Sequence, residues 1–288
     1  MPLPPSGISG LPRNWSSFPD TSRVYDALLG GRDSYQADRV LARMLLQEAQ
    51  WLPTAATINR VYGALTTSYL ARRGITQFLD LGCGYPSPSQ RRRQPHMPNV
   101  HEAVSAIHHT AVVVYVDSHP VVVGHGRARL AGPPGEHSCI QADIRDMEGL
   151  LAAPEVQAFD RSRPIAVLLH DVLPYVADDE LVDQALKILR AWLPPGSALS
   201  ITHATSDMSP VEMAAVTALY ERARITYRLR SQDHIRDLFA DWAHLGPGVV
   251  ATGRWHADHV HAQRQPQTSG AYAGIAVTPI SSNFGRHK

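Results

Sequence analysis

The stretch Phe78-Leu79-Asp80-Leu81-Gly82-Cys83-Gly84 combines an apolar run, an acidic residue and a Gly-x-Gly turn. A short apolar run that ends in a glycine turn is typical of a buried strand. The glycines let the backbone approach a ligand closely, and open α/β sheets bind their ligands beyond the carboxyl ends of the strands. Residues 78–84 therefore predict the end of a sheet strand with a ligand site beside it.

Similar apolar runs recur along the chain. They read ITQFLDLG, AVVVYVDS, HSCIQAD, PIAVLLHDV and SALSITHA, starting near residues 75, 111, 137, 164 and 197. Helical patterns lie between or after them, at residues 101–109, 120–130, 179–192, 210–222 and 232–242. This alternation predicts a parallel sheet with helices on both faces. Two late β-rich segments, 247–258 and 270–279, are expected to close the sheet as an antiparallel hairpin.

The segment before the first strand has a different composition. Residues 1–19 are rich in proline with scattered serine and glycine, which predicts a flexible arm. Residues 20–74 show helical spacing, with Asp20 or Thr21 as a possible N-cap and Gly30-Gly31 as a stop for the first helix. We therefore expect an arm at 1–19, a helical cover at 20–74 and a ligand-binding α/β domain at 75–288 that forms one compact unit with the cover.

Acidic residues stand at three successive expected strand ends, at Asp80, Asp117 and Asp143. After Gly84 the chain continues Tyr85-Pro86-Ser87-Pro88, without the third glycine of a dinucleotide fingerprint, so NAD is disfavoured. A nucleoside cofactor without a pyrophosphate needs a carboxylate for its ribose hydroxyls, and Asp117 lies at the expected edge. The pattern favours S-adenosylmethionine, although each aspartate alone also suits a helix cap or a turn.

Composition excludes several other classes of protein. The 288 residues include 44% hydrophobic residues, enough for a full core, and 27 Lys+Arg against 26 Asp+Glu leave a net charge of +1. This balance provides no field that steers the protein to nucleic acid or to an anionic membrane. Arg91-Arg92-Arg93 is the only dense basic run, and without aromatic neighbours it is interpreted as a solvated loop or a contact to an anionic acceptor or carrier.

The remaining sequence signals are weak. Cys83 and Cys139 are the only cysteines, so a disulfide framework is not expected. The absence of a signal-peptide pattern and of an apolar stretch of roughly 20 residues predicts a cytoplasmic protein, either a monomer or a homodimer. The cluster at 256–261, with three histidines and Asp258, has ligand types for zinc or nickel. It lies far in topology from the first strand ends, so no metal is expected.

Six segments together resemble the actinobacterial S-adenosylmethionine-dependent methyltransferase-like family, a branch of the class I methyltransferases, over most of residues 20–280. They are residues 22–33 (SRVYDALLGGRD), 78–84 (FLDLGCG), 99–102 (NVHE), 115–117 (YVD), 141–143 (QAD) and 200–205 (SITHAT). The resemblance implies a Rossmann-like, mostly parallel seven-stranded sheet with helices on both faces and an N-terminal helical cover.

The resemblance also implies where S-adenosylmethionine, and its product S-adenosylhomocysteine, would bind. Asp80, Gly82 and Gly84 would lie under the cofactor, with Asp117 at the ribose and Asp143 at the adenine. The full set of implied cofactor-binding residues is Asp80, Gly82, Gly84, Asp117, Ser118, Asp143, Ile144 and His170. The candidates for a lid or for acceptor contacts are Tyr25, Asp26, Arg32, Asn99 and His101. By spacing alone, Tyr25 would instead be a core residue, and Asp26 and Arg32 would be solvated.

Three segments depart from the family pattern. Residues 88–98 look like an insertion between the glycine turn and Asn99-Val100-His101. The chain has Leu173-Pro174-Tyr175 where Leu-His-Phe is expected, and Asp33-Ser34-Tyr35 where Asp-Asn precedes the aromatic residue. If a replaced side chain touches the acceptor in other members, substrate or activity should differ here.

Methyl transfer requires mainly that the acceptor atom be held in line with the methyl carbon. An oxygen acceptor also benefits from a base with a pKa near neutral, which favours histidine. His203 and His170 are the candidates, since they follow or end the fifth and fourth strands; the alternative is that each is a buried histidine bonded to a backbone carbonyl. The expected function is methylation of a small molecule on oxygen or nitrogen, and the alternative is a non-catalytic sensor or scaffold that binds the same cofactor.

Overall fold

The computed structural model describes residues 11, 14–87, 97–130, 132–133, 136–260 and 262–278. Its strands are β1 (Gln77–Leu81), β2 (Val112–Asp117), β3 (His137–Gln141), β4 (Ile165–His170), β5 (Ala198–Ala204), β6 (Ala243–His244), β7 (Val250–Ala251) and β8 (Ala271–Val277). Its α-helices are α1 (Thr21–Leu28), α2 (Gln36–Glu48), α3 (Leu52–Arg72), α4 (Val100–Ser105), α5 (Pro120–Arg129), α6 (Met147–Leu151), α7 (Pro154–Gln157), α8 (Asp179–Trp192), α9 (Pro210–Arg222) and α10 (Gln232–Asp237). Short 3-10 helices are η1 (Trp15–Ser17), η2 (Leu173–Tyr175), η3 (Thr252–Arg254) and η4 (Pro266–Ser269).

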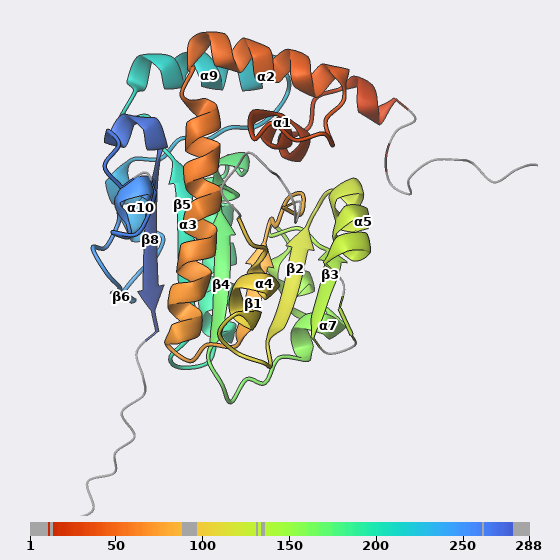
Figure 1. Ribbon diagram of the computed structural model, residues 1–288, viewed down its shortest axis with the longest axis vertical. Helices are drawn as coiled ribbons and strands as arrows, with labels where there is room; N and C mark the ends of the chain where they lie inside the picture. Colours follow the sequence, from red (N-terminus) through yellow and green to blue (C-terminus); the bar gives the residue numbers. More distant parts are fainter. Residues whose placement is uncertain are drawn as a thin grey trace, which may run out of the picture.

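The sheet has the order β3-β2-β1-β4-β5-β8-β6, with β7 also paired to β8. β1 to β5 are parallel, and β8 runs antiparallel to β5 (Figure 1). This confirms the mostly parallel α/β fold and corrects the strand number, because the described chain forms eight strands rather than seven. The extra strand arises because β6 and β7, of two residues each, both pair with β8.

Some expected element boundaries were wrong. The helix predicted at 232–242 ends at Asp237, and the β-rich segment 247–258 contributes only β7 before the chain turns into η3. The antiparallel pairing of that segment with β8 is confirmed. Asp20, rather than Thr21, caps α1, because its carboxylate accepts the N–H groups of Ser22 and Arg23.

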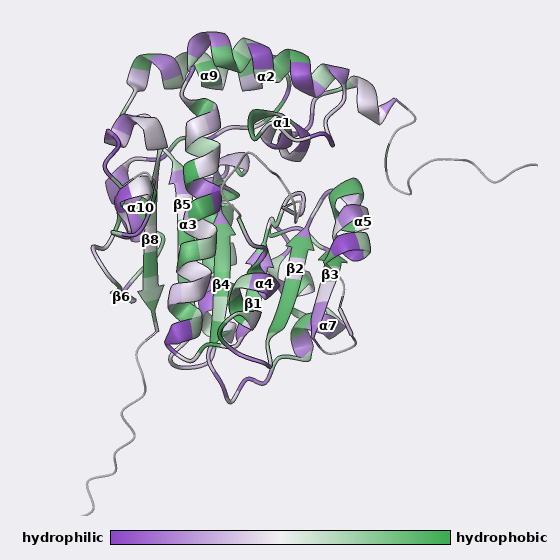
Figure 2. Cartoon of the chain, in the orientation of Figure 1, coloured by the Kyte–Doolittle hydropathy of each residue, from purple (hydrophilic) through white to green (hydrophobic). Residues whose placement is uncertain are grey.

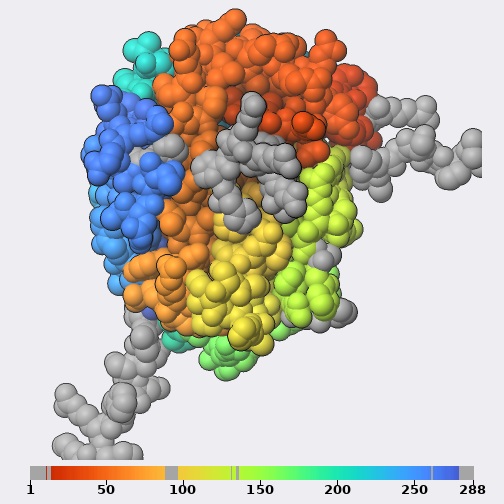
Figure 3. Space-filling model, viewed as in Figure 1, coloured from red at the N-terminus to blue at the C-terminus, as the bar shows by residue number. Residues whose placement is uncertain are grey.

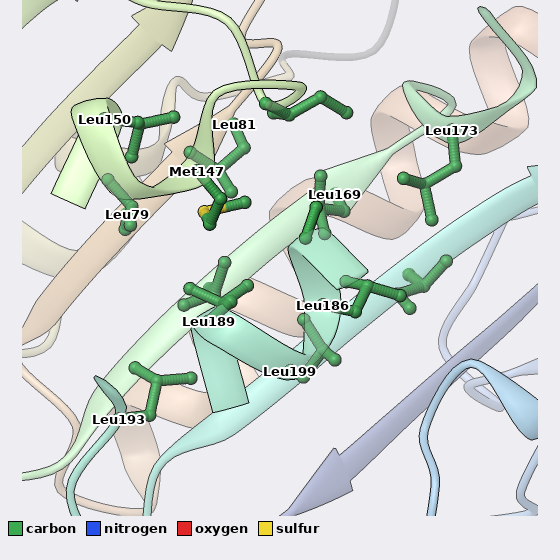
Figure 4. Packing of buried hydrophobic residues seen from close by; sticks show 14 of the residues in the cluster. Leu79, Leu81, Met147, Leu150, Leu169, Leu173, Leu186, Leu189, Leu193 and Leu199 are labelled. Atoms are coloured by element: carbon green, nitrogen blue, oxygen red, sulfur yellow. The ribbon is translucent and has the colours of Figure 1, made fainter. Parts of the chain in front are cut away.

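The parallel strands alternate side chains between two apolar layers. On β1, Phe78 packs with residues of α3, α4 and α5, whereas Leu79 and Leu81 point to the opposite face and pack with α6 and α8. Figure 2 shows β2 and β4 as hydrophobic strands inside the molecule, and Figure 4 shows Leu79 and Leu81 beside Met147 and Leu150 of α6, in the cluster that also contains Leu186 and Leu189 of α8. Each fully buried leucine contributes roughly 1.5–3 kcal/mol, so this double layer fixes the sheet and the positions of its strand ends.

The helices α1, α2 and α9 form a third apolar cluster above the carboxyl ends of β1 to β5 (Figure 1). Figure 3 shows the red and orange N-terminal segments as a continuous mass over this end of the molecule. A buried ion pair joins α1 to α2, since Arg23 Nε lies 2.8 Å from Asp38 Oδ2. Of the expected arm, residues 14–19 are described and include η1, while residues 1–10, 12 and 13 lie outside the described residues.

No helix among the described residues is long and apolar enough to cross a membrane.

Candidate active site

A cavity of about 1100 Å³ lies where the N-terminal helices meet the carboxyl ends of β1 to β4. It is lined by every residue that the resemblance implies for the cofactor: Asp80, Gly82, Gly84, Asp117, Ser118, Asp143, Ile144 and His170. Of the lid candidates, Tyr25, Asp26 and Asn99 also line it, whereas Arg32 and His101 do not. The cavity is at the upper end of the range for ligand pockets, roughly 300–1,000 Å³, so it has room for a cofactor and a second small molecule.

The glycine turn after β1 depends on its two glycines. Gly82 and Gly84 have φ values of 71° and 63°, a left-handed conformation that costs other residues energy. A Cβ on Gly82 would lie 2.4 Å from Val172 Cγ2. The N–H groups of Gly82 and Cys83 both donate to the Val116 carbonyl oxygen, at 2.8 and 3.0 Å. The turn is therefore held against β2 and leaves its open side to the cavity.

Asp117 ends β2 and is fixed by backbone donors. Its Oδ1 accepts the His119 N–H at 2.9 Å, and its Oδ2 accepts the Gly84 N–H at 3.1 Å. Burial raises the pKa of Asp117 to about 6, against the lowering effect of these hydrogen bonds. A carboxylate has about four lone-pair positions, so Asp117 keeps acceptor capacity for a ribose hydroxyl.

Asp80 and Arg60 interact electrostatically beside the glycine turn, and both line the cavity. Burial raises the pKa of Asp80 to about 7, and the nearby Arg60 guanidinium partly offsets this. Arg60, on α3, donates from Nη2 to the Tyr85 carbonyl oxygen at 3.1 Å and lies 3.2 Å from where a Cβ on Gly84 would be. An acid and a guanidinium at one end of a cavity can bind the ammonium and the carboxylate of an amino acid.

Asp143 follows β3 and is engaged by a neighbour. Both of its carboxylate oxygens bond the Arg145 side chain, and this contact lowers the pKa of Asp143. The Asp143 carboxylate is half-exposed and ionised. A nucleoside base beside Asp143 would therefore compete with Arg145 for hydrogen bonds to this carboxylate. Ile144, the next residue, adds an apolar surface to the same part of the cavity.

The two histidines proposed as bases lie in different places. His170 lines the cavity, and its Nε2 lies 2.9 Å from Ser200 Oγ. His203 is buried outside the cavity lining, where its Nδ1 donates to the Ala204 carbonyl and its Nε2 accepts from Arg230 at 2.7 Å. Burial lowers the pKa of each histidine to about 3. Neutral histidines with so low a pKa are poor general bases near neutral pH. His203 in addition does not line the cavity.

The lid candidates divide by their contacts. The Tyr25 hydroxyl donates to the Ala56 carbonyl oxygen and accepts from Asn59 Nδ2 at 2.9 Å. Asp26 Oδ2 accepts the Asp33 N–H at 2.9 Å. Arg32 is exposed. Tyr25 and Asp26 thus belong to the wall of the cavity, and the alternative in which Asp26 is simply solvated is wrong, because Asp26 is buried.

Two further candidates lie beside the segment 88–98. Asn99 Oδ1 accepts the Ser87 N–H at 2.9 Å, so Asn99 joins the two chain ends on either side of residues 88–96, which lie outside the described residues together with Arg91-Arg92-Arg93. His101 Nδ1 lies 2.8 Å from the Tyr115 hydroxyl. His101 therefore holds the Tyr115 hydroxyl by a hydrogen bond, and Tyr115 lines the cavity whereas His101 does not.

The histidine-rich segment shows no metal-ligand geometry. Among the described residues no three His, Cys, Asp or Glu side chains form a group suited to a metal ion, and His261 lies outside those residues. His259 Nε2 lies 3.0 Å from the Ile58 carbonyl oxygen, so this ring ties the late segment to α3.

Among the charged cavity residues that sequence reasoning missed, Arg60 and Asp171 matter most for the site. Asp171 follows β4 directly, so the strand-end rule that selected Asp80 and Asp117 would have found it. Its φ is 59°, and burial raises its pKa to about 7. Arg60 has no such signal, because a single arginine in a long helix gives no indication that it faces a strand end.

The parallel sheet, the glycine turn and the row of strand-end carboxylates define a class I methyltransferase fold with a cavity at the carboxyl ends of its strands. Residues 13–279 match the protein-family model described as "S-adenosyl methyltransferase", so the chain belongs to this family. The cofactor of the enzyme is accordingly S-adenosylmethionine.

Two solved structures from actinobacteria are similar over nearly the whole chain. One is a Thermobifida fusca protein provisionally assigned as a methyltransferase, with 34% identity, coverage of 96% of this chain and 98% of that one, and a TM-score of 0.83. The other is a DUF574 family protein from Streptomyces avermitilis, with 29% identity, coverage of 92% and 99%, and a TM-score of 0.84. A search of curated proteins finds no match.

Proposed function

We propose that the enzyme methylates a small-molecule acceptor, on nitrogen or oxygen, inside the cavity between the N-terminal helices and the sheet. The supporting observation is the cavity of about 1100 Å³, whose lining contains all the cofactor-type residues and, in addition, Tyr25, Asp171 and Tyr175. The acceptor would occupy the part of the cavity beside these three residues. The sensor or scaffold alternative is not retained, because family membership identifies an enzyme.

In the proposed complex, Asp117 binds the ribose hydroxyls, and Asp143 and Ile144 lie at the adenine. Asp80 binds the ammonium of the methionine part, and Arg60 binds its carboxylate. The bound cofactor supplies an electrophilic methyl group on a positively charged sulfur. The division into an arm at 1–19, a cover at 20–74 and an α/β domain at 75–288 belongs to the same proposal, as do the cytoplasmic location and a monomeric or homodimeric state.

The cover contributes by excluding water and fixing orientation. α3 brings Asn59 and Arg60 over the strand ends, and Asn59 Oδ1 accepts from Thr202 Oγ1 of β5 at 2.7 Å. The Tyr25 hydroxyl bonds the same Asn59 side chain. The wall formed by α1 and α3 is thereby tied to the sheet, which keeps reacting groups in line.

Calorimetric titration with S-adenosylmethionine, S-adenosylhomocysteine and NAD tests the cofactor site. We expect micromolar binding of the first two and none of NAD. Arg60→Met should weaken both by about 10-fold through loss of a charge-assisted contact. Arg72→Met, which removes an exposed guanidinium from the same helix, is the matched control and should bind normally.

Transfer itself is tested by release of S-adenosylhomocysteine in the presence of a panel of amines, alcohols and phenols. Product formation with a small molecule supports the proposal. Methylation only of a protein or nucleic acid would contradict it.

A further inference from the structure

The cavity lining contains a half-buried carboxylate, that of Asp171, without a partner among the described residues. Across the described residues, no hydrogen bond or ion pair engages the Asp171 side chain, although its backbone N–H donates to the Thr202 carbonyl oxygen at 3.0 Å. Such a group is costly to bury unless a ligand pairs with it. Its left-handed backbone adds a further cost, and strain of this kind gathers at functional sites.

The surroundings of Asp171 are aromatic. Asp171 acts electrostatically on Tyr25, Tyr175, Tyr220 and Tyr227, raising the pKa of each hydroxyl. Tyr25 and Tyr175 line the cavity with Asp171. Behind Tyr175, the rings of Tyr220 and Tyr227 lie with centroids 6.4 and 5.5 Å from its own. A carboxylate among electron-rich rings is the chemistry that recognises an ammonium group.

We infer that the acceptor is an amine, bound in its protonated form by the Asp171 carboxylate among the rings of Tyr25 and Tyr175, and that Asp171 takes the proton the nitrogen must lose before methyl transfer. This inference rests on the proposed function and specifies its substrate class.

The position of Asp171 suits this role. Val172, the next residue, packs against Gly82 of the glycine turn, so Asp171 lies one residue from a contact with the cofactor-binding turn. On the other side, the Arg60 guanidinium carbon is 5.7 Å from the centre of the Tyr25 ring. The position of Arg60, between Gly84 and the Tyr25 ring, thus connects the glycine turn to the tyrosines around Asp171.

The reaction balances in charge and atoms. The ammonium R–NH₃⁺ gives one proton to the Asp171 carboxylate, which leaves the neutral amine and a carboxylic acid. The nitrogen lone pair then forms the N–CH₃ bond while the S–CH₃ bond breaks and its electron pair stays on sulfur. The products are R–NH₂–CH₃⁺, S-adenosylhomocysteine and the protonated Asp171, which returns its proton to water when the product leaves.

The neighbouring titratable groups do not compete for the proton. Burial raises the pKa of Tyr25 and Tyr175, so both stay neutral, and the pKa of His170, lowered to about 3, makes it a weak base. Arg60 and Arg224 are the arginines on this part of the cavity lining, and neither forms an ion pair with Asp171. A pKa of about 7 allows Asp171 both to hold an ammonium and to accept its proton near neutral pH.

The test is calorimetric titration of matched probes into the enzyme saturated with S-adenosylhomocysteine. The probes are phenethylamine against 2-phenylethanol, and tryptamine against tryptophol, pairs that differ only in the amine. We expect each amine to bind about 10-fold to 100-fold more tightly than its alcohol. Asp171→Asn should remove this preference, and asparagine suits the left-handed backbone. Asp183→Asn, an exposed carboxylate on α8, should keep it.

The outcomes separate the two proposals. Equal affinity for amine and alcohol in both pairs, or a preference that survives Asp171→Asn in a folded variant, overturns the amine assignment while the cofactor site stands. Loss of S-adenosylhomocysteine affinity in Asp171→Asn would place Asp171 at the cofactor and also overturn it. Failure of the wild-type enzyme to bind S-adenosylhomocysteine would instead overturn the proposed function, and this inference with it.

Discussion

The Gly84 N–H donates to Asp117 Oδ2 at 3.1 Å, so the turn after β1 and the end of β2 are joined by the carboxylate proposed to hold the ribose. One side chain therefore both shapes the glycine turn and provides acceptors for the ligand. This double role separates Asp117 from Asp143, whose carboxylate bonds only its neighbour Arg145 within the described chain.

Replacing Asp117 should weaken cofactor binding. Asp117→Ala removes the ribose acceptor and frees the turn, and we expect a loss of about 1–3 kcal/mol in S-adenosylhomocysteine affinity. Calorimetry measures it. Asp117→Asn keeps one acceptor oxygen and should lose less. Unchanged affinity in a folded Asp117→Ala variant would contradict the ribose assignment.

The glycine turn gives a matched pair of substitutions. Gly82→Ala meets both a left-handed φ and Val172, whereas Gly74→Ala, at a φ of 91°, meets no atom within 4 Å. Gly74→Ala should cost about 1–2 kcal/mol of stability from backbone strain alone and keep cofactor binding. Gly82→Ala should cost roughly 1–3 kcal/mol more and lose affinity. Urea unfolding and titration check this, and equal effects of the two changes would be evidence against a tight turn.

The cover should depend on the buried pair of Arg23 and Asp38. Asp38 also accepts the N–H groups of Tyr35 and Asp20, and Arg23 donates to the Phe18 carbonyl oxygen. Asp38→Ala leaves a buried guanidinium unpaired and should cost about 3–5 kcal/mol in the free energy of unfolding.

The control for this prediction is an exposed ion pair. Asp233→Ala breaks the contact with Arg236 at the surface and should cost about 0–1 kcal/mol. A similar cost for Asp38→Ala and Asp233→Ala, measured by urea denaturation, would show that the cover does not rely on the buried pair.

The raised pKa of Asp171 predicts a pH-dependent stability. Because the folded pKa of about 7 exceeds the usual value of 3.8 for an aspartate, the folded state binds more protons between about pH 4 and 7, and stability falls as pH rises through that window. Asp171→Asn removes this contribution. The unfolding free energy of the variant minus that of the wild type should therefore rise by about 1–3 kcal/mol from pH 4 to pH 8. Denaturation of both proteins at the two pH values measures the change. A difference independent of pH would mean that Asp171 titrates normally.

Local patterns in the sequence determined the sheet and the residues proposed to bind the cofactor. Apolar runs ended by glycine or aspartate located β1 to β4, and a further apolar run located β5. Tyr25, Asp26 and Asn99, which were selected from the family motifs in 22–33 and 99–102, line the cavity, and their roles there stay a prediction. These features are readable because strand ends and turns depend on residues adjacent in the chain. The short β6 and β7 escaped prediction, since two-residue strands are defined only by their pairing with β8.

Tertiary structure decided which residues are proposed to contact the acceptor. His203 and His170 suit a base by residue type, but burial lowers their pKa and Arg230 engages His203. The strand-end rule could have selected Asp171 from the sequence, but only packing shows that it lies among tyrosines from α1, η2, α9 and the segment after α9. The sequence by itself determined which residues end the strands; the ionisation and neighbours of those residues depend on burial and on contacts between distant segments, which only the folded chain creates.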